Sequence, residues 1–394
     1  MGSGEASGGG RRTGKPVDRT ELCKHVRRLV VKVGSGVLSR GTLCLQAEAI
    51  QGLAKQIALL MAQEVEILLV SSGAVMAGLA RLERKVRPRS IPLKQAAAAI
   101  GQGVLMATYE EAFTQFGVKV AQVLLTQEDV QDRVRYLNAR NTLFTLLALG
   151  VLPIVNENDT VAVEEIKFGD NDILSALVAS VVDADLLVML TDQEGLYTAD
   201  PRTSREARLI PVLSSPFPPE AFWAGPTQTL TGIGGMASKV EAARLATASH
   251  IPAVAANGLT PDILLRLAAG ESLGTLFLPQ AAKMRSRKRW LAFAARPKGG
   301  IQVDGGAKRA LIHQGRSLLP SGVQRTVKAF HVGDVVSILG PDREEFARGL
   351  VNYSAEEVEQ IKGRKSTEIE RVLGYKHSDE VIHRDNLVIL EMQE

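Results

Sequence analysis

Two lysines in this sequence stand next to turns that are rich in glycine. Lys32 lies two residues before the run Gly34-Ser35-Gly36, and Lys239 ends a second glycine-rich run at residues 232–239. Glycines after a strand let backbone N–H groups approach an anion closely, and a lysine ammonium can bind the same anion. Two lysines and backbone amides without a nucleophile suit phosphoryl transfer, which needs positioning and charge neutralisation. Each motif is weak alone, because glycine turns after strands are common and Lys32 could simply face solvent.

Polar side chains are concentrated in two further runs that lie close together in the chain. Asp and Asn together can bind the ammonium and the carboxylate of an amino acid. The competing interpretation is turn chemistry, with Asp172 as an ordinary helix N-cap. The density of polar residues favours a binding site. The two runs are Asn156-Glu157-Asn158-Asp159 and Gly169-Asp170-Asn171-Asp172.

Two more clusters combine hydroxyl groups with small residues. Ser71-Ser72-Gly73-Ala74 could hold a carboxylate or a phosphate at a helix start, although a plain capped helix is the better local interpretation. The other cluster opens with Thr191-Asp192. No G-x-S-x-G frame is present, which argues against a serine nucleophile, and Ser39 stands where a dinucleotide-binding turn needs its third glycine. The sequence also lacks H-E-x-x-H and any Cys/His cluster, so it predicts no transition-metal site.

These clusters need a scaffold that brings them together, and the hydrophobic pattern predicts one. Short β-branched runs alternate with helical periodicity from residue 28 to about 270, which is typical of an α/β sandwich with a mainly parallel sheet. Ligands of such sheets bind at the carboxyl ends of the strands, so the clusters are expected to converge there. The expected strands are 29–33, 65–70, 118–125, 151–155, 185–190 and 252–256, and the expected helices are 47–61, 91–116, 129–149, 172–182, 237–249 and 261–269.

Composition divides the chain into four parts. Residues 1–26 are rich in glycine and basic, which predicts a disordered tail, and residues 27–282 hold the predicted catalytic domain. A basic run indicates a linker at 283–296, and shorter strands with frequent turns predict a small β-rich domain at 297–394. In that domain we expect capping boxes at Ser354 with Glu357 and at Thr367 with Glu370.

Charge and cysteine content exclude several protein classes. Residues 1–28 hold seven Lys or Arg and three acids, so 7 − 3 = +4 accounts for the whole net charge of +4, and the folded body gives no global case for a nucleic-acid partner. The two cysteines cannot form a disulfide framework, and no stretch has the ~18 apolar residues of a membrane span. Without a hydrophobic signal core at the N-terminus, a cytoplasmic location is expected.

Taken together, the motifs resemble the amino acid kinase superfamily, and its glutamate 5-kinases in particular. The resemblance covers about residues 27–392 and implies a three-layer sandwich followed by a PUA domain. It implies transfer of the γ-phosphate of ATP to the γ-carboxylate of L-glutamate, which starts proline biosynthesis. The residues that carry it are Lys32–Gly36, Ser71–Ala74, Asn156–Asp159, Phe168–Asp172, Leu190–Arg202, Gly234–Lys239, Arg287–Trp290 and Leu373–Tyr375.

The resemblance also implies a role for each matching residue. Lys32 and Lys239 flank the transferred phosphoryl group, and Asp172 orients both lysines. Ser72, Asp159 and Asn171 bind glutamate, with Asp159 at its ammonium. Magnesium is expected on the phosphates, with most of its waters retained. The family usually has threonine where this chain has Ile233, so one hydroxyl contact to the nucleotide is lost. ATP is expected to contact Lys32, Gly34, Ser35, Gly36, Thr191, Asp192, Ile233, Gly234, Gly235, Met236, Ala237, Ser238 and Lys239.

The same resemblance suggests a homodimer or homotetramer and feedback inhibition by L-proline. Two alternatives remain at this point. One is a sibling kinase, for N-acetylglutamate or aspartate, although a blocked amine would have no use for Asp159. The other is an RNA-binding protein acting through residues 297–394. These residues hold 14 Lys or Arg and 15 Asp or Glu, a balance of 14 − 15 = −1, so we expect weak, salt-sensitive RNA binding at most.

Overall fold

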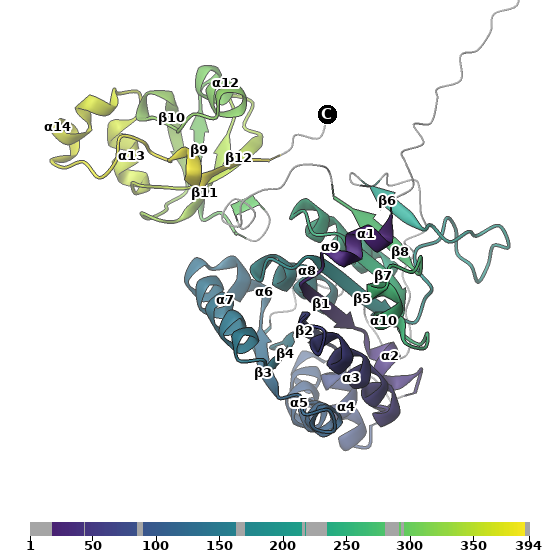
Figure 1. Cartoon of the computed structure of the whole chain (residues 1–394). Helices are drawn as coiled ribbons and strands as arrows, with labels where there is room; N and C mark the ends of the chain where they lie inside the picture. The colour runs from purple at the N-terminus through teal and green to yellow at the C-terminus, as the bar shows by residue number, and fades with distance from the viewer. Residues whose placement is uncertain are drawn as a thin grey trace, which may run out of the picture.

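The structure is a computed structural model, shown in Figure 1. It describes residues 18–42, 44–84, 90–162, 170–214, 217, 235–279, 291–292 and 295–390. Most of the predicted linker and residues 1–17 of the predicted tail lie outside the described residues. Among the helices that the structure describes, none combines the length and the apolar character needed to cross a membrane.

An eight-stranded sheet forms the centre of the larger domain, in the order β3-β4-β2-β1-β5-β7-β8-β6. Neighbouring strands run parallel except β7 and β8, which are antiparallel. This confirms the predicted α/β class with a mainly parallel sheet. The strands are β1 (Arg28–Val33), β2 (Glu66–Ser71), β3 (Val120–Leu125), β4 (Leu152–Glu157), β5 (Leu186–Thr191), β6 (Val212–Ser214), β7 (Ala253–Asn257) and β8 (Thr275–Leu278).

Helices cover both faces of this sheet (Figure 1). Leu29, Val31 and Val33 of β1 pack into one apolar core with α3, α5 and α10. Val30 points the other way, into the core formed with α7, α8 and α9. Side chains alternate along a strand, so Lys32 must face the same side as Val30. The helices are α2 (Ser35–Ser39), α3 (Ala47–Met61), α4 (Ala74–Arg81), α5 (Ile91–Thr114), α6 (Gln127–Gln131), α7 (Arg133–Ala148), α8 (Asp170–Val181), α9 (Met236–Ala248) and α10 (Ile263–Ala268).

Helices α4 and α5 cross in unusually close contact because two glycines meet backbone there. A Cβ atom on Gly78 would lie 1.7 Å from the carbonyl oxygen of Ala97. A Cβ atom on Gly101 would lie 1.8 Å from the carbonyl oxygen of Ala74. No side chain fits at either glycine without separating the helices. This crossing brings the middle of α5 close to the start of α4, which follows the Ser71-Ser72 turn.

The end of the predicted tail is ordered, which corrects the sequence prediction for residues 18–26. Asp18 caps helix α1 (Arg19–Lys24) by accepting from the backbone N–H of Thr20. The buried Arg19 guanidinium donates to the carbonyl oxygens of Leu273 (2.6 Å) and Pro211 (2.5 Å). This helix was not predicted, because its apolar content is low. Its anchor is a charged side chain that donates hydrogen bonds to backbone carbonyls distant in the chain.

Another prediction fails at the start of α10. The helix expected at 261–269 covers Ile263–Ala268 instead, with Asp262 at the N-cap position. Asp262 has φ = 52°, in the left-handed region, which aspartate tolerates better than most residues. The chain therefore turns once more before the helix begins at Ile263.

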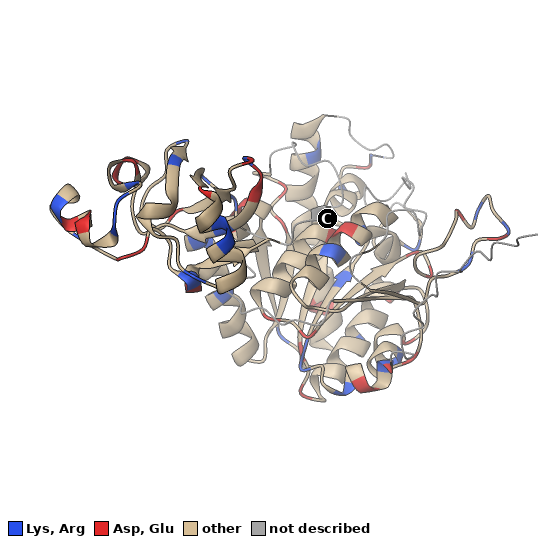
Figure 2. Cartoon of the chain, turned by 90° about the horizontal axis from the view of Figure 1, so that it is seen from above, with Lys and Arg blue, Asp and Glu red and all other residues tan. Residues whose placement is uncertain are grey.

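The second domain is built on a five-stranded sheet in the order β10-β9-β11-β12-β13, around its own apolar core. The predicted capping box of Ser354 and Glu357 is confirmed at α13. The second predicted box, Thr367 with Glu370, is wrong. Glu368 is the N-cap residue of α14 and makes no side-chain cap bond there, while its carboxylate accepts from the backbone N–H of Lys365 over 3.0 Å. Figure 2 shows basic and acidic positions interspersed along this domain. Its elements are β9 (Gly299–Val303), α12 (Gly305–Gln314), η2 (Pro320–Gly322), β10 (Val323–Val327), β11 (Val335–Leu339), β12 (Glu345–Leu350), α13 (Ala355–Ile361), η3 (Ser366–Glu368), α14 (Ile369–Leu373), η4 (Arg384–Asn386) and β13 (Leu387–Ile389).

Candidate active site

Two lysines and one aspartate form a buried charged cluster at the carboxyl end of the central strands. Lys32 Nζ lies 2.7 Å from Asp172 Oδ1, and Lys239 Nζ lies 3.2 Å from Asp172 Oδ2. Asp172 is 1% exposed, and each lysine is 5% exposed. Lys32 comes from β1, Asp172 from the first turn of α8 and Lys239 from the first turn of α9. The inward orientation of Lys32 follows from helices α8 and α9, which cover its face of the sheet.

The charges in this cluster depend on one another. Burial alone would raise the pKa of Asp172, but Lys239 and Lys32 hold it far below its ordinary value. Burial lowers the pKa of Lys32, against the opposing effect of Asp172, and the charge of Lys239 lowers it as well. Asp172 is therefore ionised between two lysines. With both lysines protonated, these three side chains carry one positive charge in excess, which the nearby Asp192 carboxylate partly offsets. A buried excess of positive charge is well suited to binding an anion.

The starts of two helices add to this positive potential. Helix α9 has no side-chain cap at Gly235, and the positive ends of α8 and α9 both lie at the cluster. Ser238 in the first turn of α9 donates from Oγ to Asp172 Oδ2 over 2.6 Å. Ser238 is thus placed beside the carboxylate that binds both lysines. Met236 is buried and Ala237 is exposed, while Ile233 and Gly234 lie outside the described residues.

The glycine turn after β1 borders the cluster. A Cβ atom on Gly34 would lie 3.6 Å from Lys32 Nζ, and one on Gly36 would lie 3.4 Å from Asp192 Oδ2. The turn and the end of β5 are therefore neighbours, as expected if both bind one ligand. The Gly34 N–H, however, donates to the Leu190 carbonyl oxygen over 3.2 Å. This corrects the expectation that Gly34 offers a backbone donor, because that N–H already joins β1 to β5.

At the end of β5, Thr191 and Asp192 lie together. Thr191 Oγ1 is 3.2 Å from Asp192 Oδ1. Ser35 begins α2 directly after the Gly34 turn. The predicted nucleotide-binding residues that the structure describes thus gather around the lysines, from β1, β5 and α9.

On the other side of Asp172, side-chain amides form a connected network. Asn171 Nδ2 lies 3.2 Å from Ser72 Oγ and 3.0 Å from Asn156 Oδ1. Asn156 Nδ2 in turn donates to Gln102 Oε1 over 2.8 Å. Asp159 is partly buried in the turn that follows β4, three residues beyond Asn156. The residues predicted to bind glutamate are thus grouped at the ends of β2 and β4 and the start of α8.

Gln102 belongs to this network although the motif analysis did not identify it. It sits in the middle of α5, an alanine-rich helix, with no motif around it. Only the close crossing at Gly101 brings it within reach of Asn156. The one available signal was that Gln102 is a polar residue beside Gly101, within the Ala- and Gly-rich stretch 96–103 of α5.

The described residues include no group of three or more His, Cys, Asp or Glu side chains arranged to hold a metal ion. In this cluster the carboxylate of Asp172 already binds two lysines. A metal ion here would therefore need most of its ligands from a bound substrate and from water.

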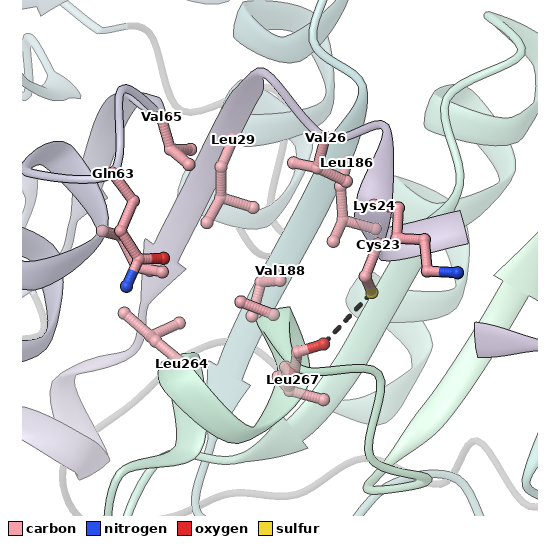
Figure 3. Close-up of a pocket in the computed structure, with 12 residues that line it drawn as sticks. Cys23, Lys24, Val26, Leu29, Gln63, Val65, Leu186, Val188, Leu264 and Leu267 are labelled. Carbon is pink, nitrogen blue, oxygen red and sulfur yellow. Dashed lines mark hydrogen bonds between the residues drawn. The ribbon is translucent and has the colours of Figure 1, made fainter. Parts of the chain in front are cut away.

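A separate cavity of about 230 Å³ lies at the opposite edge of the same sheet (Figure 3). Most of the residues that line it are apolar, among them Leu29 and Leu186 from the amino ends of β1 and β5. Cys23 Sγ donates there to the Leu267 carbonyl oxygen over 3.1 Å, and burial raises the pKa of this thiol. The amino ends of the strands are remote from the lysines, so this cavity is not part of the charged site.

Comparison with known proteins places this geometry in a family. A model of the amino acid kinase family matches residues 27–257, and one of the PUA domain matches residues 299–373. Glutamate 5-kinases of Geobacter sulfurreducens and Moorella thermoacetica are each 51% identical to this chain, over 94% and 93% of it and over 100% and 97% of their own lengths. Among solved structures, UMP kinase from Bacillus anthracis aligns with a TM-score of 0.45 and 16% identity over 65% of this chain and 97% of that one. The chain belongs to the amino acid kinase family, among its glutamate 5-kinases, and carries a PUA domain.

Proposed function

We propose that this chain transfers the γ-phosphoryl group of ATP to the γ-carboxylate of L-glutamate at the cluster of Lys32, Asp172 and Lys239. The observation that carries the proposal is the pair of buried lysines held on one buried aspartate. The names of the relatives point to the same reaction. The products are ADP and glutamyl 5-phosphate, an acyl phosphate.

The reaction needs positioning and charge neutralisation more than acid–base catalysis. A γ-carboxylate oxygen attacks the γ-phosphorus, the bond to the β,γ-bridging oxygen breaks, and ADP leaves with that electron pair. Glutamate is already ionised at neutral pH, so no base has to remove a proton. Both reactants are anions that repel each other. Lys32 and Lys239 would offset this repulsion and stabilise the charge on the equatorial oxygens in the transition state.

Asp172 would act as a positioning residue in this scheme. Its two oxygens bind different lysines, so one carboxylate fixes the separation of both ammonium groups. The Ser238 hydroxyl holds the same carboxylate in place. We assign the ATP side of the site to Ser35, Gly36, Thr191, Asp192 and the first turn of α9, and the glutamate side to Ser72, Asp159 and Asn171.

Magnesium fits this site only in a particular way. The described residues offer no cluster of three acidic or imidazole ligands, so the ion would be held mainly by ATP phosphates and water, as Mg²⁺ often is. When bound, it supplies further neutralisation of phosphate charge.

We also propose, from the family alone, a cytoplasmic homodimer or homotetramer that L-proline inhibits. Light scattering after gel filtration and a proline titration of the activity test these two properties.

The first prediction concerns the acceptor. With ATP and Mg²⁺, we expect ADP release to depend on L-glutamate, and hydroxylamine to trap a hydroxamate from the acyl phosphate. N-acetylglutamate and L-aspartate serve as controls, and we expect neither to support comparable turnover. Phosphorylation of N-acetylglutamate alone would show that the amine is not recognised and would overturn the assigned substrate.

A second prediction follows from the lowered pKa of Lys32. This lysine loses its proton at a lower pH than an ordinary lysine of pKa 10.5. The alkaline decrease of kcat/KM should therefore begin at a lower pH than the titration of an ordinary lysine would give. Arginine stays charged throughout this range. In Lys32→Arg, which is expected to be slower at every pH, the alkaline fall should move to higher pH or disappear. The pH profile of kcat/KM for both proteins checks this. The same apparent pKa in both would mean that another group titrates.

A further inference from the structure

The amide network of Gln102, Asn156 and Asn171 has a direction that backbone groups set. Asn156 Oδ1 accepts from the backbone N–H of Glu157 over 2.8 Å. A backbone N–H can only donate, so the oxygen of Asn156 must face it. The nitrogen of Asn156 then faces Gln102, and only the oxygen of Gln102 can accept from it, at 2.8 Å. The Gln102 NH₂ group therefore points away from Asn156.

A second backbone group orients Asn171 independently. Asn171 Nδ2 lies 3.2 Å from the carbonyl oxygen of Ser71, which can only accept. The same nitrogen donates to Asn156 Oδ1 over 3.0 Å. The oxygen of Asn171 therefore points away from both groups. Neither the Asn156 amide nor the Asn171 amide can be flipped without placing two donors or two acceptors against each other.

These orientations leave one donor and one acceptor without a partner. Gln102 Nε2 and Asn171 Oδ1 are buried, and within the described residues neither has a hydrogen-bond partner. A buried polar group left unsatisfied costs about 1–3 kcal/mol. Two such groups joined through one asparagine, beside the proposed phosphoryl-transfer cluster, are best explained by a ligand that supplies one acceptor and one donor.

We propose that Gln102 determines acceptor specificity by donating from Nε2 to the α-carboxylate of the substrate amino acid, while Asn171 Oδ1 accepts from its ammonium. This inference rests on the proposed function. The γ-carboxylate must lie at the lysines, so the other end of the substrate carries the α-carboxylate and the ammonium. Asn171 is next to Asp172, whereas Gln102 lies one side chain farther from the lysines, beyond Asn156. An NH₂ group cannot accept a hydrogen bond, so it binds the carboxylate and not the ammonium.

The test compares substrates that differ at one group. In 4-aminobutyrate the γ-carboxylate and the amine of glutamate are present and the α-carboxylate is absent. Gln102→Leu removes the donor while keeping most of the side-chain volume. We expect kcat/KM for L-glutamate to fall about 10- to 100-fold, mainly through KM, because a hydrogen bond to a charged group is lost. The affinity for 4-aminobutyrate, measured as substrate or as competitive inhibitor of L-glutamate, should stay the same.

A charge variant and a matched control complete the experiment. Gln102→Glu places a carboxylate against the α-carboxylate and should raise the KM for L-glutamate more than Gln102→Leu does. Gln115→Leu makes the same change at the exposed end of α5 and should leave every constant unaltered. Equal losses with L-glutamate and 4-aminobutyrate would show a structural role and overturn the inference. So would unchanged kinetics in a wild type that phosphorylates L-glutamate, whereas a wild type inactive with L-glutamate would overturn the proposed function itself.

Discussion

Replacing Lys239 by methionine is expected to lower kcat by about three orders of magnitude with little change in the KM for L-glutamate. Methionine keeps the length of the side chain and removes its charge. Preorganised groups that stabilise transition-state charge in a buried site each contribute about 10²–10³ in kcat. The charge on the transferring phosphoryl group would be the interaction lost, so kcat and kcat/KM should fall together.

This variant should fold normally, because Asp172 keeps Lys32 and Ser238 as partners. Steady-state kinetics therefore measure the effect on catalysis, and a thermal melt separately checks that the variant is folded. Lys55→Met, at an exposed position of α3, is the matched control and should retain full activity. A loss of less than tenfold in kcat for Lys239→Met would mean that this lysine does not contact the reacting phosphoryl group.

Asp172→Asn is expected to damage both stability and activity. The substitution leaves two buried lysines facing each other without a counter-charge, and breaking a buried ion pair in this way costs about 3–5 kcal/mol of folding free energy. The lysines would also lose their common anchor, so we expect kcat to fall by about two to three orders of magnitude. Denaturant unfolding and kinetics, with the exposed Asp385→Asn as control, measure both effects.

The stability difference between the wild type and Asp172→Asn should depend on pH in a definite direction. The pKa of Asp172 is lowered in the folded state, so its contribution is fully present above the unfolded value of about 4 and is lost as pH falls toward the folded value. The free energies of unfolding of the wild type and of Asp172→Asn should therefore converge as the pH falls. A difference that stays constant down to the acid transition would show that Asp172 is not the ionised partner of the lysines.

The strands and long helices were predictable because their signals are local. β-Branched runs ended by glycine or serine marked β1 and β2, and helical spacing marked α3 and α5. The carboxyl ends of parallel strands necessarily meet at one edge, so the convergence of the polar clusters was predictable as well. In contrast, the short elements α2, α4 and β6 carry too few residues for a periodic pattern and were missed.

Where the sequence left an alternative open or the prediction failed, tertiary contacts decided the outcome. Lys32 could have faced solvent on a half-exposed strand, and only the packing of α8 and α9 over it decides otherwise. The Gly34 N–H is taken by a carbonyl oxygen from β5, a strand more than 150 residues later in the chain. Gln102 contacts a residue 54 positions away, so no window of sequence contains both partners.

The charged cluster draws its three members from segments far apart in the chain, and this has a consequence for folding. Asp172 follows Lys32 by 172 − 32 = 140 residues, with β2, β3 and β4 between them, and β1 pairs in parallel with β5, the strand between α8 and α9 in the chain. Parallel pairing of distant strands is intrinsically slow, because loop closure precedes any favourable contact. We therefore expect a partly folded intermediate without the β1–β5 pair to lack the native arrangement of the two ammonium groups. Catalytic activity should therefore return during refolding at the rate of the slowest step of sheet assembly. An activity assay would then measure the rate of that step directly.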